Sequence, residues 1–121
     1  IEKMMQLLNS RQMHYTVTMN GSSTRIPITE IAYFESQGHY IVVHYNEKSL
    51  RFKARMSDIE AALSKCFFVR CHVGYLLNCR FVQICSRTSV TLTDGTVLPV
   101  SRAKAEETQT AFMAYMRSLR P

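Results

Sequence analysis

The sequence lacks the features of a membrane-spanning or exported protein. No apolar run in its 121 residues approaches the roughly 18 residues that a transmembrane helix needs, and no signal-peptide pattern opens the chain. We therefore expect a cytoplasmic domain that makes no membrane contact. Because the chain starts at Ile1 rather than at an initiating Met, we interpret it as a piece of a longer polypeptide.

Familiar catalytic and metal-binding motifs are also missing. The chain has no Gly-rich phosphate loop, no H-E-x-x-H and no G-x-S-x-G, so we expect no enzymatic activity. Its cysteines do not show the close pairing of zinc ligands; they are Cys66, Cys71, Cys79 and Cys85. Since they lie among apolar residues, we expect buried free thiols, no metal and no cofactor.

The sequence does contain an apolar core and an excess of positive charge. Hydrophobic residues make up 46% of the chain, enough for one packed domain and unlike a disordered segment. Fifteen Lys and Arg against nine Asp and Glu give a net charge of +6. Nucleic acid is the commonest partner of such a chain, although a membrane surface or solubility alone would also explain the charge.

Hydrophobic periodicity predicts a mostly β fold. Apolar residues at Ile1, Met4, Met5 and Leu8 indicate a short N-terminal helix. Alternation with a period of two then predicts strands, which form a meander joined by tight turns. The expected strands are 15–19, 25–26, 31–36, 39–45, 49–54, 67–69, 81–85, 89–93 and 96–100. Residues 73–78 are expected to form a turn or a single helical turn.

A short middle helix and a C-terminal helix complete the predicted fold. Ser57 and Glu60 fit a capping box for a helix that ends near Lys65. Ser101 is placed to cap the final helix. The expected apolar face of that helix consists of Ala105, Thr108, Phe112, Tyr115 and Leu119. We divide the chain into an N-terminal linker helix with the first strand, 1–22, and a main domain, 23–121.

Three segments place polar or cationic residues at the ends of apolar stretches. They are Glu35-Ser36-Gln37-Gly38-His39-Tyr40, the run from Phe67 to Asn78, and Leu98-Pro99-Val100-Ser101-Arg102. In this order they closely resemble the LytTR family of bacterial DNA-binding domains, and three ordered motifs are more specific than one. The resemblance extends roughly from Arg25 to Leu119. It implies antiparallel β-sheets, arranged as a meander or sandwich, and sequence-specific binding of double-stranded DNA.

The resemblance also implies a role and partners. It implies a transcriptional regulator whose loops, rather than a recognition helix, enter successive major grooves, with two copies as a possible dimer on promoter repeats. The usual upstream partner in this family is a receiver domain in the same full-length chain, which would make this domain the output module of a two-component response regulator. Some members carry membrane sensors instead.

The three motifs supply the candidate DNA-binding residues, which are Gln37, His39, Arg70, His72, Val73, Ser101, Arg102 and Lys104. His39 follows Gly38 at a tight turn, so we expect its ring at a loop tip. Arg70 and His72 lie two apart on a strand and therefore share a face. The family commonly has a polar or basic residue and then Ser after this His. Here Val73 and Gly74 replace them, and Val73 can still pack on a thymine methyl.

Cations at the start of the last helix favour an anion site. Arg102 and Lys104 oppose the helix dipole, and each placement reduces the stability of the fold by about 0.3 kcal/mol or more unless an anion lies nearby. We therefore expect Arg102, Lys104 and Arg70 to contact phosphates beside the Ser101 hydroxyl, and Arg102 and His39 to reach base edges. The alternative is a Ser cap with solvated cations. Three further cations, Arg51, Lys53 and Arg55, share one face of the strand 49–54 and its end. We interpret them as its solvated side, and the alternative is an extension of the DNA footprint.

Two other classes of function stay open. One is a protein-interaction or ligand-sensing β module whose charge is incidental. The other is an RNA or single-strand binder, in which Tyr40, Tyr45 and Phe52 would stack on bases. Clustering of His39, His72 and Arg102 would favour duplex DNA, an exposed aromatic platform would favour single strands, and a deep apolar pocket would favour ligand sensing.

Overall fold

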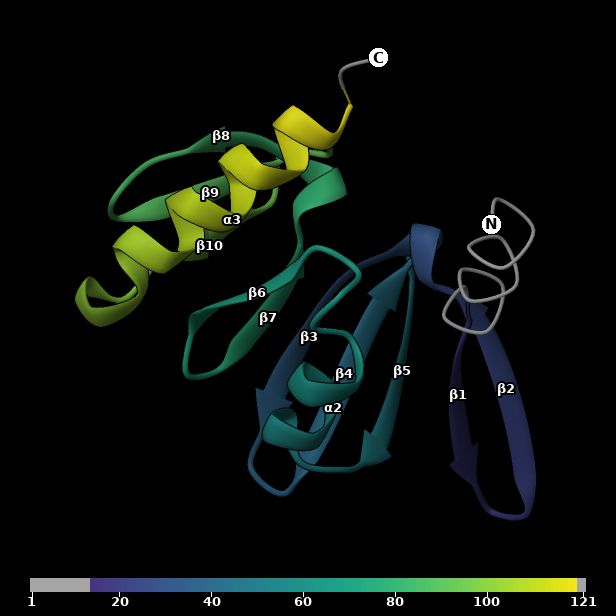
Figure 1. Ribbon diagram of the computed structural model, residues 1–121. Helices are drawn as coiled ribbons and strands as arrows, with labels where there is room; N and C mark the ends of the chain where they lie inside the picture. Colours follow the sequence, from purple (N-terminus) through teal and green to yellow (C-terminus); the bar gives the residue numbers. More distant parts are fainter. Residues whose placement is uncertain (1–13, 120–121) are drawn as a thin grey trace.

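The computed structural model describes residues 14–119. Three antiparallel sheets and two α-helices make up this part of the chain (Figure 1). This architecture confirms the prediction of a mostly β fold with a middle helix and a C-terminal helix. The predicted N-terminal helix lies outside the described residues. No helix within 14–119 has the length and apolar character needed to cross a bilayer.

A five-stranded sheet in the order β5-β4-β3-β7-β6 occupies the centre of the fold. Tight turns join β3 to β4 and β4 to β5, and Gly38 adopts a φ of +63° at the first of them, where a side chain would be strained. The strands are β3 (Ile31–Gln37), β4 (Tyr40–Tyr45), β5 (Lys48–Lys53), β6 (Phe68–His72) and β7 (Tyr75–Asn78).

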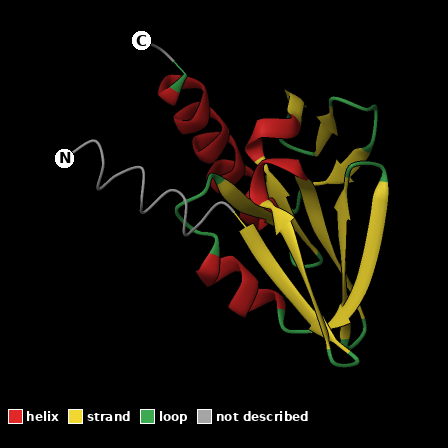
Figure 2. Ribbon diagram, turned by 90° about the vertical axis from the view of Figure 1, so that its right-hand side faces the viewer, coloured by secondary structure: helices red, strands yellow, loops and turns green. Residues whose placement is uncertain are grey.

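Two smaller sheets flank the central one. The hairpin of β1 (His14–Met19) and β2 (Ser22–Pro27) is one of them. The other has the order β10-β9-β8. Its strands are β8 (Val82–Cys85), β9 (Ser89–Leu92) and β10 (Val97–Pro99). The two α-helices are α2 (Met56–Ala62) and α3 (Ala105–Ser118), drawn as coiled ribbons in Figure 1 and in red in Figure 2.

The central sheet separates two hydrophobic cores. One core packs the sheet against α2 and the β1–β2 hairpin, and it includes Val17, Phe34, Val43, Ile59 and Leu76. The other packs it against α3 and the β8–β10 sheet, and it includes Cys71, Leu77, Val90, Leu98 and Tyr115. Leu76 and Leu77 are neighbours on β7 that enter different cores, so this strand is buried on both faces.

Burial on both faces explains why the prediction for residues 73–78 was wrong. We expected a turn or a helical turn there, and residues 75–78 form strand β7. A strand covered on both sides is apolar at successive positions, so it lacks the period-two alternation that identifies half-exposed strands.

The capping predictions were also wrong. Helix α2 begins at Met56, and no side chain caps it, because buried Met56 starts the helix one residue before Ser57. Ser101 precedes a 3-10 turn, Arg102–Lys104, and its hydroxyl caps nothing; instead its carbonyl accepts from the Lys104 amide at 3.0 Å. Of the predicted apolar face of α3, Leu119 is 59% exposed because the helix ends at Ser118.

Candidate nucleic-acid interface

A β-bulge in β6 shapes the turn that carries the second motif. Val69 pairs with Leu77, but the next pair is His72 with Tyr75, so β6 has one extra residue between the two pairs. Bulges re-aim side chains next to functional sites. Here Cys71 is fully buried while Arg70 and His72, on either side of it, are half-buried and accessible.

The Arg70 guanidinium is hydrogen-bonded within the protein. Its Nε and Nη2 donate to the Val73 carbonyl oxygen at 3.3 and 2.8 Å. Its Nη1 lies 3.4 Å from Glu60 Oε1 on α2, and the Arg70 side chain is 20% exposed. The guanidinium thus bonds the turn through two nitrogens, and the Glu60 carboxylate offsets its positive charge.

The tip of the β6–β7 turn presents His72 and Val73. His72 Nδ1 accepts a hydrogen bond of 3.0 Å from the Gly74 amide. An accepting Nδ1 carries no proton, so the neutral ring has its proton on Nε2 and offers a donor there. Val73 is 68% exposed, more than any other large hydrophobic side chain in residues 14–119. The turn therefore presents one defined donor beside one apolar group.

The third motif lies beside this turn. The Ser101 amide donates to the Cys71 carbonyl oxygen at 2.9 Å, which fixes the 3-10 turn against β6. A shallow cleft results, and it is lined by Arg70, His72, Val73, Ser101, Ala103 and Lys104. Lys104 Nζ is 3.5 Å from Glu107 Oε1. Arg102 is exposed and borders an adjoining hollow with Arg87 and Thr88.

The first motif meets the same turn from its other side. The Ser36 amide donates to the Gly74 carbonyl oxygen at 2.9 Å, so the β3–β4 turn lies beside the β6–β7 turn. Gln37 and His39 are both exposed, which agrees with a loop tip. His39 lines a second cleft together with Arg70. Arg70 thus borders the clefts of both neighbouring motifs.

Two cations of this second cleft were not among the predicted site residues. Lys53 and Arg55 line it with His39, because the pairing of Tyr40 with Lys53 brings the end of β5 to the β3–β4 turn. We had interpreted the cations of this strand as its solvated side. The sequence held a signal for this cleft, because the β4–β5 hairpin brings the residue before β4, His39, next to the last residue of β5, Lys53.

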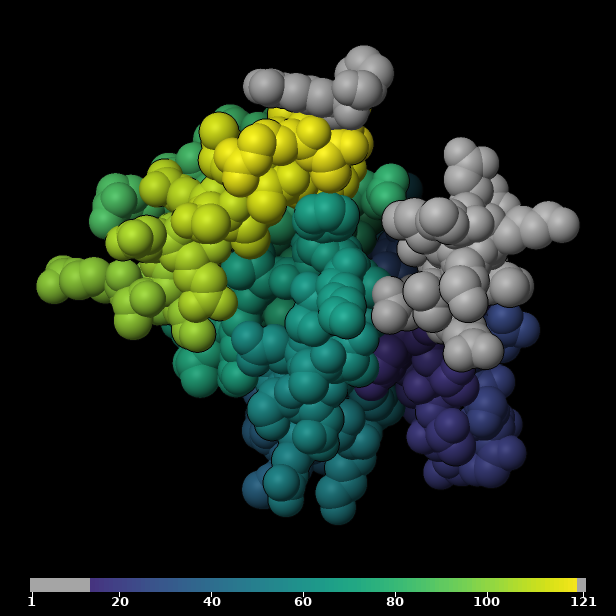
Figure 3. Space-filling model, viewed as in Figure 1, coloured from purple at the N-terminus to yellow at the C-terminus, as the bar shows by residue number. Residues whose placement is uncertain are grey.

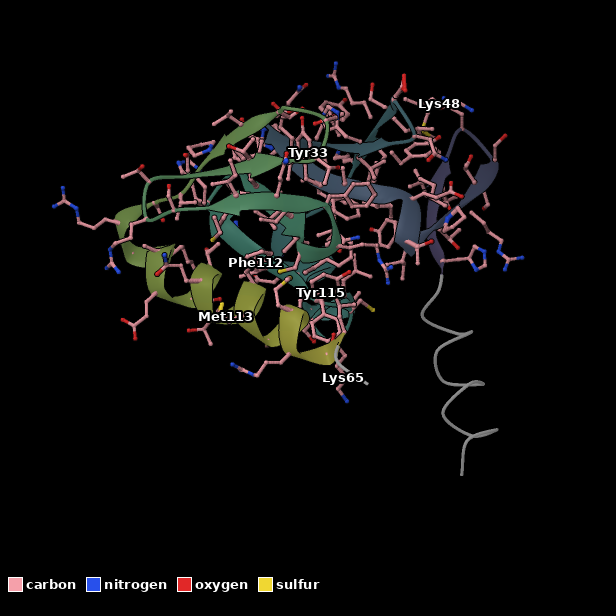
Figure 4. The ribbon with its side chains drawn as sticks, turned by 90° about the horizontal axis from the view of Figure 1, so that it is seen from above. Tyr33, Lys48, Lys65, Phe112, Met113 and Tyr115 are labelled. Carbon is pink, nitrogen blue, oxygen red and sulfur yellow. The ribbon has the colours of Figure 1, made fainter. Side chains whose placement is uncertain are left out.

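The surface of the molecule shows how these segments adjoin. Figure 3 shows α3, in yellow-green, next to the teal segment that contains α2 and β6. Of these two elements, β6 packs against α3 in one hydrophobic core. Seen from above, α3 with Met113 and Tyr115 lies on one side of the sheets, and Lys48 lies far from it at the β4–β5 turn (Figure 4).

The buried thiols lie beneath this surface. Cys71 and Cys79 are fully buried, as expected, whereas Cys66 and Cys85 are only half-buried. Burial is the main cause that raises the pKa of Cys71 and of Cys79 to about 12. Thiols that stay protonated at neutral pH are poor nucleophiles and poor metal ligands. Residues 14–119 contain no cluster of His, Cys, Asp and Glu fit for a metal ion.

The structure lacks the features expected of a ligand-sensing module or of a single-strand binder in the part of the chain that it describes. A separate hollow near the β4–β5 turn is lined by polar and apolar residues in similar measure, among them His44, Asn46, Phe81 and Leu92, so it is not the apolar pocket expected of a ligand sensor. Of the three aromatics proposed to stack on single strands, Phe52 is buried and Tyr45 half-buried. Tyr40 is 40% exposed, with the Arg51 guanidinium 4.2 Å from its ring centroid.

The fold is that of a β-rich domain whose exposed turns carry basic side chains. Residues 21–113 match the family model described as the LytTr DNA-binding domain, so the chain belongs to the LytTR family. This confirms the resemblance found in the sequence. The description of this family names DNA binding.

A solved structure agrees with this assignment. It is the LytTr DNA-binding domain, from Bacillus cereus, of a protein described as a methyl-accepting/DNA response regulator. The match has a TM-score of 0.69 at 19% sequence identity, and it covers 81% of this chain and 94% of that one. At this identity the likeness shows the fold alone. No curated protein matches the sequence significantly.

Proposed function

We propose that the chain is the sequence-specific, duplex-DNA-binding output module of a bacterial transcriptional regulator. The observation that carries the proposal is the meeting of all three motifs at the β6–β7 turn, through the hydrogen bonds Ser36 to Gly74 and Ser101 to Cys71. Duplex recognition requires several loops to present donors and cations on one surface, where phosphate contacts position the protein and base contacts specify the site.

Each exposed group has a chemistry that suits one part of the duplex. Lys104 and the Ser101 hydroxyl suit phosphate oxygens, and the net charge of +6 suits the backbone as a whole. Arg102, with five donors in a planar fork, suits a guanine edge. His39 and the Nε2 donor of His72 suit base acceptors, Gln37 suits adenine, and Val73 suits a thymine methyl.

We further propose that two copies bind repeated promoter sites and that an upstream receiver domain in the same full-length chain controls them. The support for a receiver is that the similar Bacillus cereus domain is described as part of a response regulator. The support for repeated sites is the family assignment. Both statements concern the full-length protein rather than the described domain.

Selection of bound sequences from a random duplex library tests the proposal. We expect a preferred site to be enriched, and the affinity for it to exceed that for a shuffled duplex. If about five or six phosphates are neutralised, log K should fall against log salt with a slope of about −5. The absence of any preferred site, or an affinity that does not depend on salt, would overturn the proposal.

A further inference from the structure

We infer that Arg70 acts as a positioning residue, which holds the DNA-contacting turn from within the protein, and does not itself bind a phosphate. The inference rests on the proposed DNA-binding function and replaces the role that the sequence suggested for this cation. It starts from the contacts of the guanidinium with the Val73 carbonyl oxygen and the Glu60 carboxylate.

The guanidinium closes the β6–β7 turn. Two of its nitrogens converge on the Val73 carbonyl oxygen, at 3.3 and 2.8 Å, so the side chain of a strand residue is bonded to the tip of its own turn. The third nitrogen faces Glu60, whose carboxylate offsets the positive charge. Because Glu60 offsets the charge of Arg70 and only 20% of the Arg70 side chain is exposed, Arg70 attracts a phosphate less strongly than an exposed, unpaired cation does.

The turn that Arg70 closes is the point at which the three motifs meet. Cys71 accepts from Ser101, and Gly74 accepts from Ser36, so residues 71–74 hold both neighbouring segments by backbone bonds. His72 is oriented by Gly74 within the same turn. A change in the shape of this turn therefore moves the candidate base-contacting groups of all three motifs at once.

The position of β6 explains why the turn needs a clamp. β6 is the last strand of the central sheet, so only β7 pairs with it along its length. The bulge between Val69 and His72 removes part of that pairing next to the turn. Arg70 lies within the bulge, and its side-chain hydrogen bonds to the Val73 carbonyl oxygen stabilise the turn where strand pairing is interrupted. Bulges at sheet edges and beside functional sites commonly re-aim a side chain in this way.

The experiment separates positioning from phosphate binding by two measurements on the same duplexes. For Arg70→Ala we expect the affinity for the selected duplex to fall by about 5- to 150-fold. The preference over a shuffled duplex should shrink, and the slope of log K against log salt should stay within error of the unmodified protein. A lost phosphate contact would instead flatten that slope by about one unit and weaken both duplexes alike.

Two matched variants complete the design. Arg70→Lys keeps the charge, but one ammonium cannot bond the Val73 carbonyl from two nitrogens while it pairs with Glu60, so we expect it to behave like Arg70→Ala. Lys104→Ala, at the neighbouring cation, should show the opposite pattern, with a flatter slope and an unchanged preference. Full recovery of binding by Arg70→Lys, together with a flatter slope in Arg70→Ala, would overturn the inference.

Amide hydrogen exchange gives a measurement that does not depend on DNA. We expect faster exchange at the Ser36 and Gly74 amides in Arg70→Lys than in the unmodified domain, with the amides of β9 unchanged. Protection equal to that of the unmodified domain would overturn the inference. If Arg70→Ala does not fold, Arg70→Lys decides alone. If the unmodified protein prefers no duplex, the proposed function fails, while the exchange measurement still tests the clamp.

Discussion

The Ser101 amide donates a hydrogen bond of 2.9 Å to the carbonyl oxygen of Cys71, the buried residue between Arg70 and His72. This bond attaches the segment that leads into α3 to the edge strand of the central sheet. It brings Lys104 and His72 to one cleft. The basic surface thus depends on backbone geometry that residue types alone do not reveal.

Lys104→Ala should weaken binding to all duplexes alike. The Lys104 ammonium lies 3.5 Å from the Glu107 carboxylate on an accessible surface, and such pairs contribute little to folding. We expect the slope of log K against log salt to flatten by about one unit, because one phosphate contact is lost. A salt series of binding isotherms measures this slope.

Lys48→Ala provides the control for that series. The substitution removes the same charge from the β4–β5 turn, far from α3 (Figure 4). Lys48 pairs with Tyr45, whereas Tyr40, next to the β3–β4 turn, pairs with Lys53 at the other end of the hairpin. Its slope should match that of the unmodified protein. Equal slopes for both Lys variants would mean that the positive charge acts as a whole and that Lys104 makes no contact of its own.

Arg102→Ala should reduce specificity rather than general affinity. Arg102 is exposed on the 3-10 turn, and no ion pair holds it among the residues that the structure describes. We expect a loss of about 1 to 3 kcal/mol on the selected site and much less on a shuffled duplex, because a bidentate guanine contact would be lost. Arg102→Lys should not restore the preference.

Competition binding with the two duplexes measures this difference, and thermal unfolding serves as its control. The melting temperature should barely move, since an exposed cation at the start of a helix contributes little to folding. An equal loss on both duplexes would make Arg102 a phosphate contact. Unfolding of the variant would make it a structural residue.

Sequence reasoning succeeded where side-chain pattern and structure are directly linked. Alternation located the half-exposed strands β5 and β9, the turn residues between 37 and 48 delimited β3 and β4, and the ordered motifs identified the family. It failed at β7, because a strand buried on both faces has no alternation. It failed at Ser57 and Ser101, because packing of Met56 and the bond to Cys71 decide where those turns begin.

The site shows the same division. The motifs predicted which residues are exposed around His39 and Arg102, and both are exposed. The partners of Arg70 could not be predicted, since Glu60 and Val73 approach it only after α2 packs on the sheet and β6 acquires a bulge. Contacts between distant segments depend on such irregularities, which a single sequence does not encode in a readable pattern.

The His72 ring should be held as one tautomer. Because Nδ1 accepts from the Gly74 amide at 3.0 Å, the proton of the neutral ring should reside on Nε2. Two-bond proton–nitrogen NMR spectra of the free domain distinguish the tautomers directly. A signal pattern with a protonated Nδ1 in the neutral ring would contradict the orientation of this side chain and the donor that we assign to it.

The free energy of unfolding should fall as the pH rises above about 9. Burial raises the pKa of Cys71 and Cys79 from 9.0 to about 12. The unfolded chain therefore loses these protons at a lower pH than the folded one, and the stability present below pH 9 is lost on the way to 12. Each thiol contributes a slope of about 1.4 kcal/mol per pH unit in that window.

Urea unfolding between pH 7.5 and 10 measures this slope. The double variant Cys71→Ala with Cys79→Ala should be less stable at neutral pH, since it leaves small cavities, but its stability should depend less on pH. Other groups titrate equally in both proteins, so the difference between the two slopes isolates the thiols. Identical slopes would mean that the thiols are accessible or that the folded domain opens around them.

Asn78→Ala should destabilise the domain more than a change at its exposed neighbour Arg80. The side chain is 2% exposed, and its Nδ2 donates to the carbonyl oxygens of Ile31 at 2.9 Å and Ile28 at 3.3 Å. Its Oδ1 accepts from the Arg80 amide at 3.0 Å. Asn78 thus joins the end of β7 to the turn that precedes β3.

Removal of this amide leaves backbone groups without partners at a site that water reaches poorly. Each unpaired buried group costs about 1 to 3 kcal/mol, so we expect the free energy of unfolding to fall by about 2 to 4 kcal/mol. Asn78→Asp should be at least as harmful at neutral pH, because it removes both donors and buries a charge. Arg80→Ala, at the exposed neighbour, should change stability by less than about 0.5 kcal/mol. Chemical unfolding of the three variants decides the matter: a change in Asn78→Ala no larger than in Arg80→Ala would mean that the two carbonyl oxygens find other partners and that this junction does not depend on Asn78.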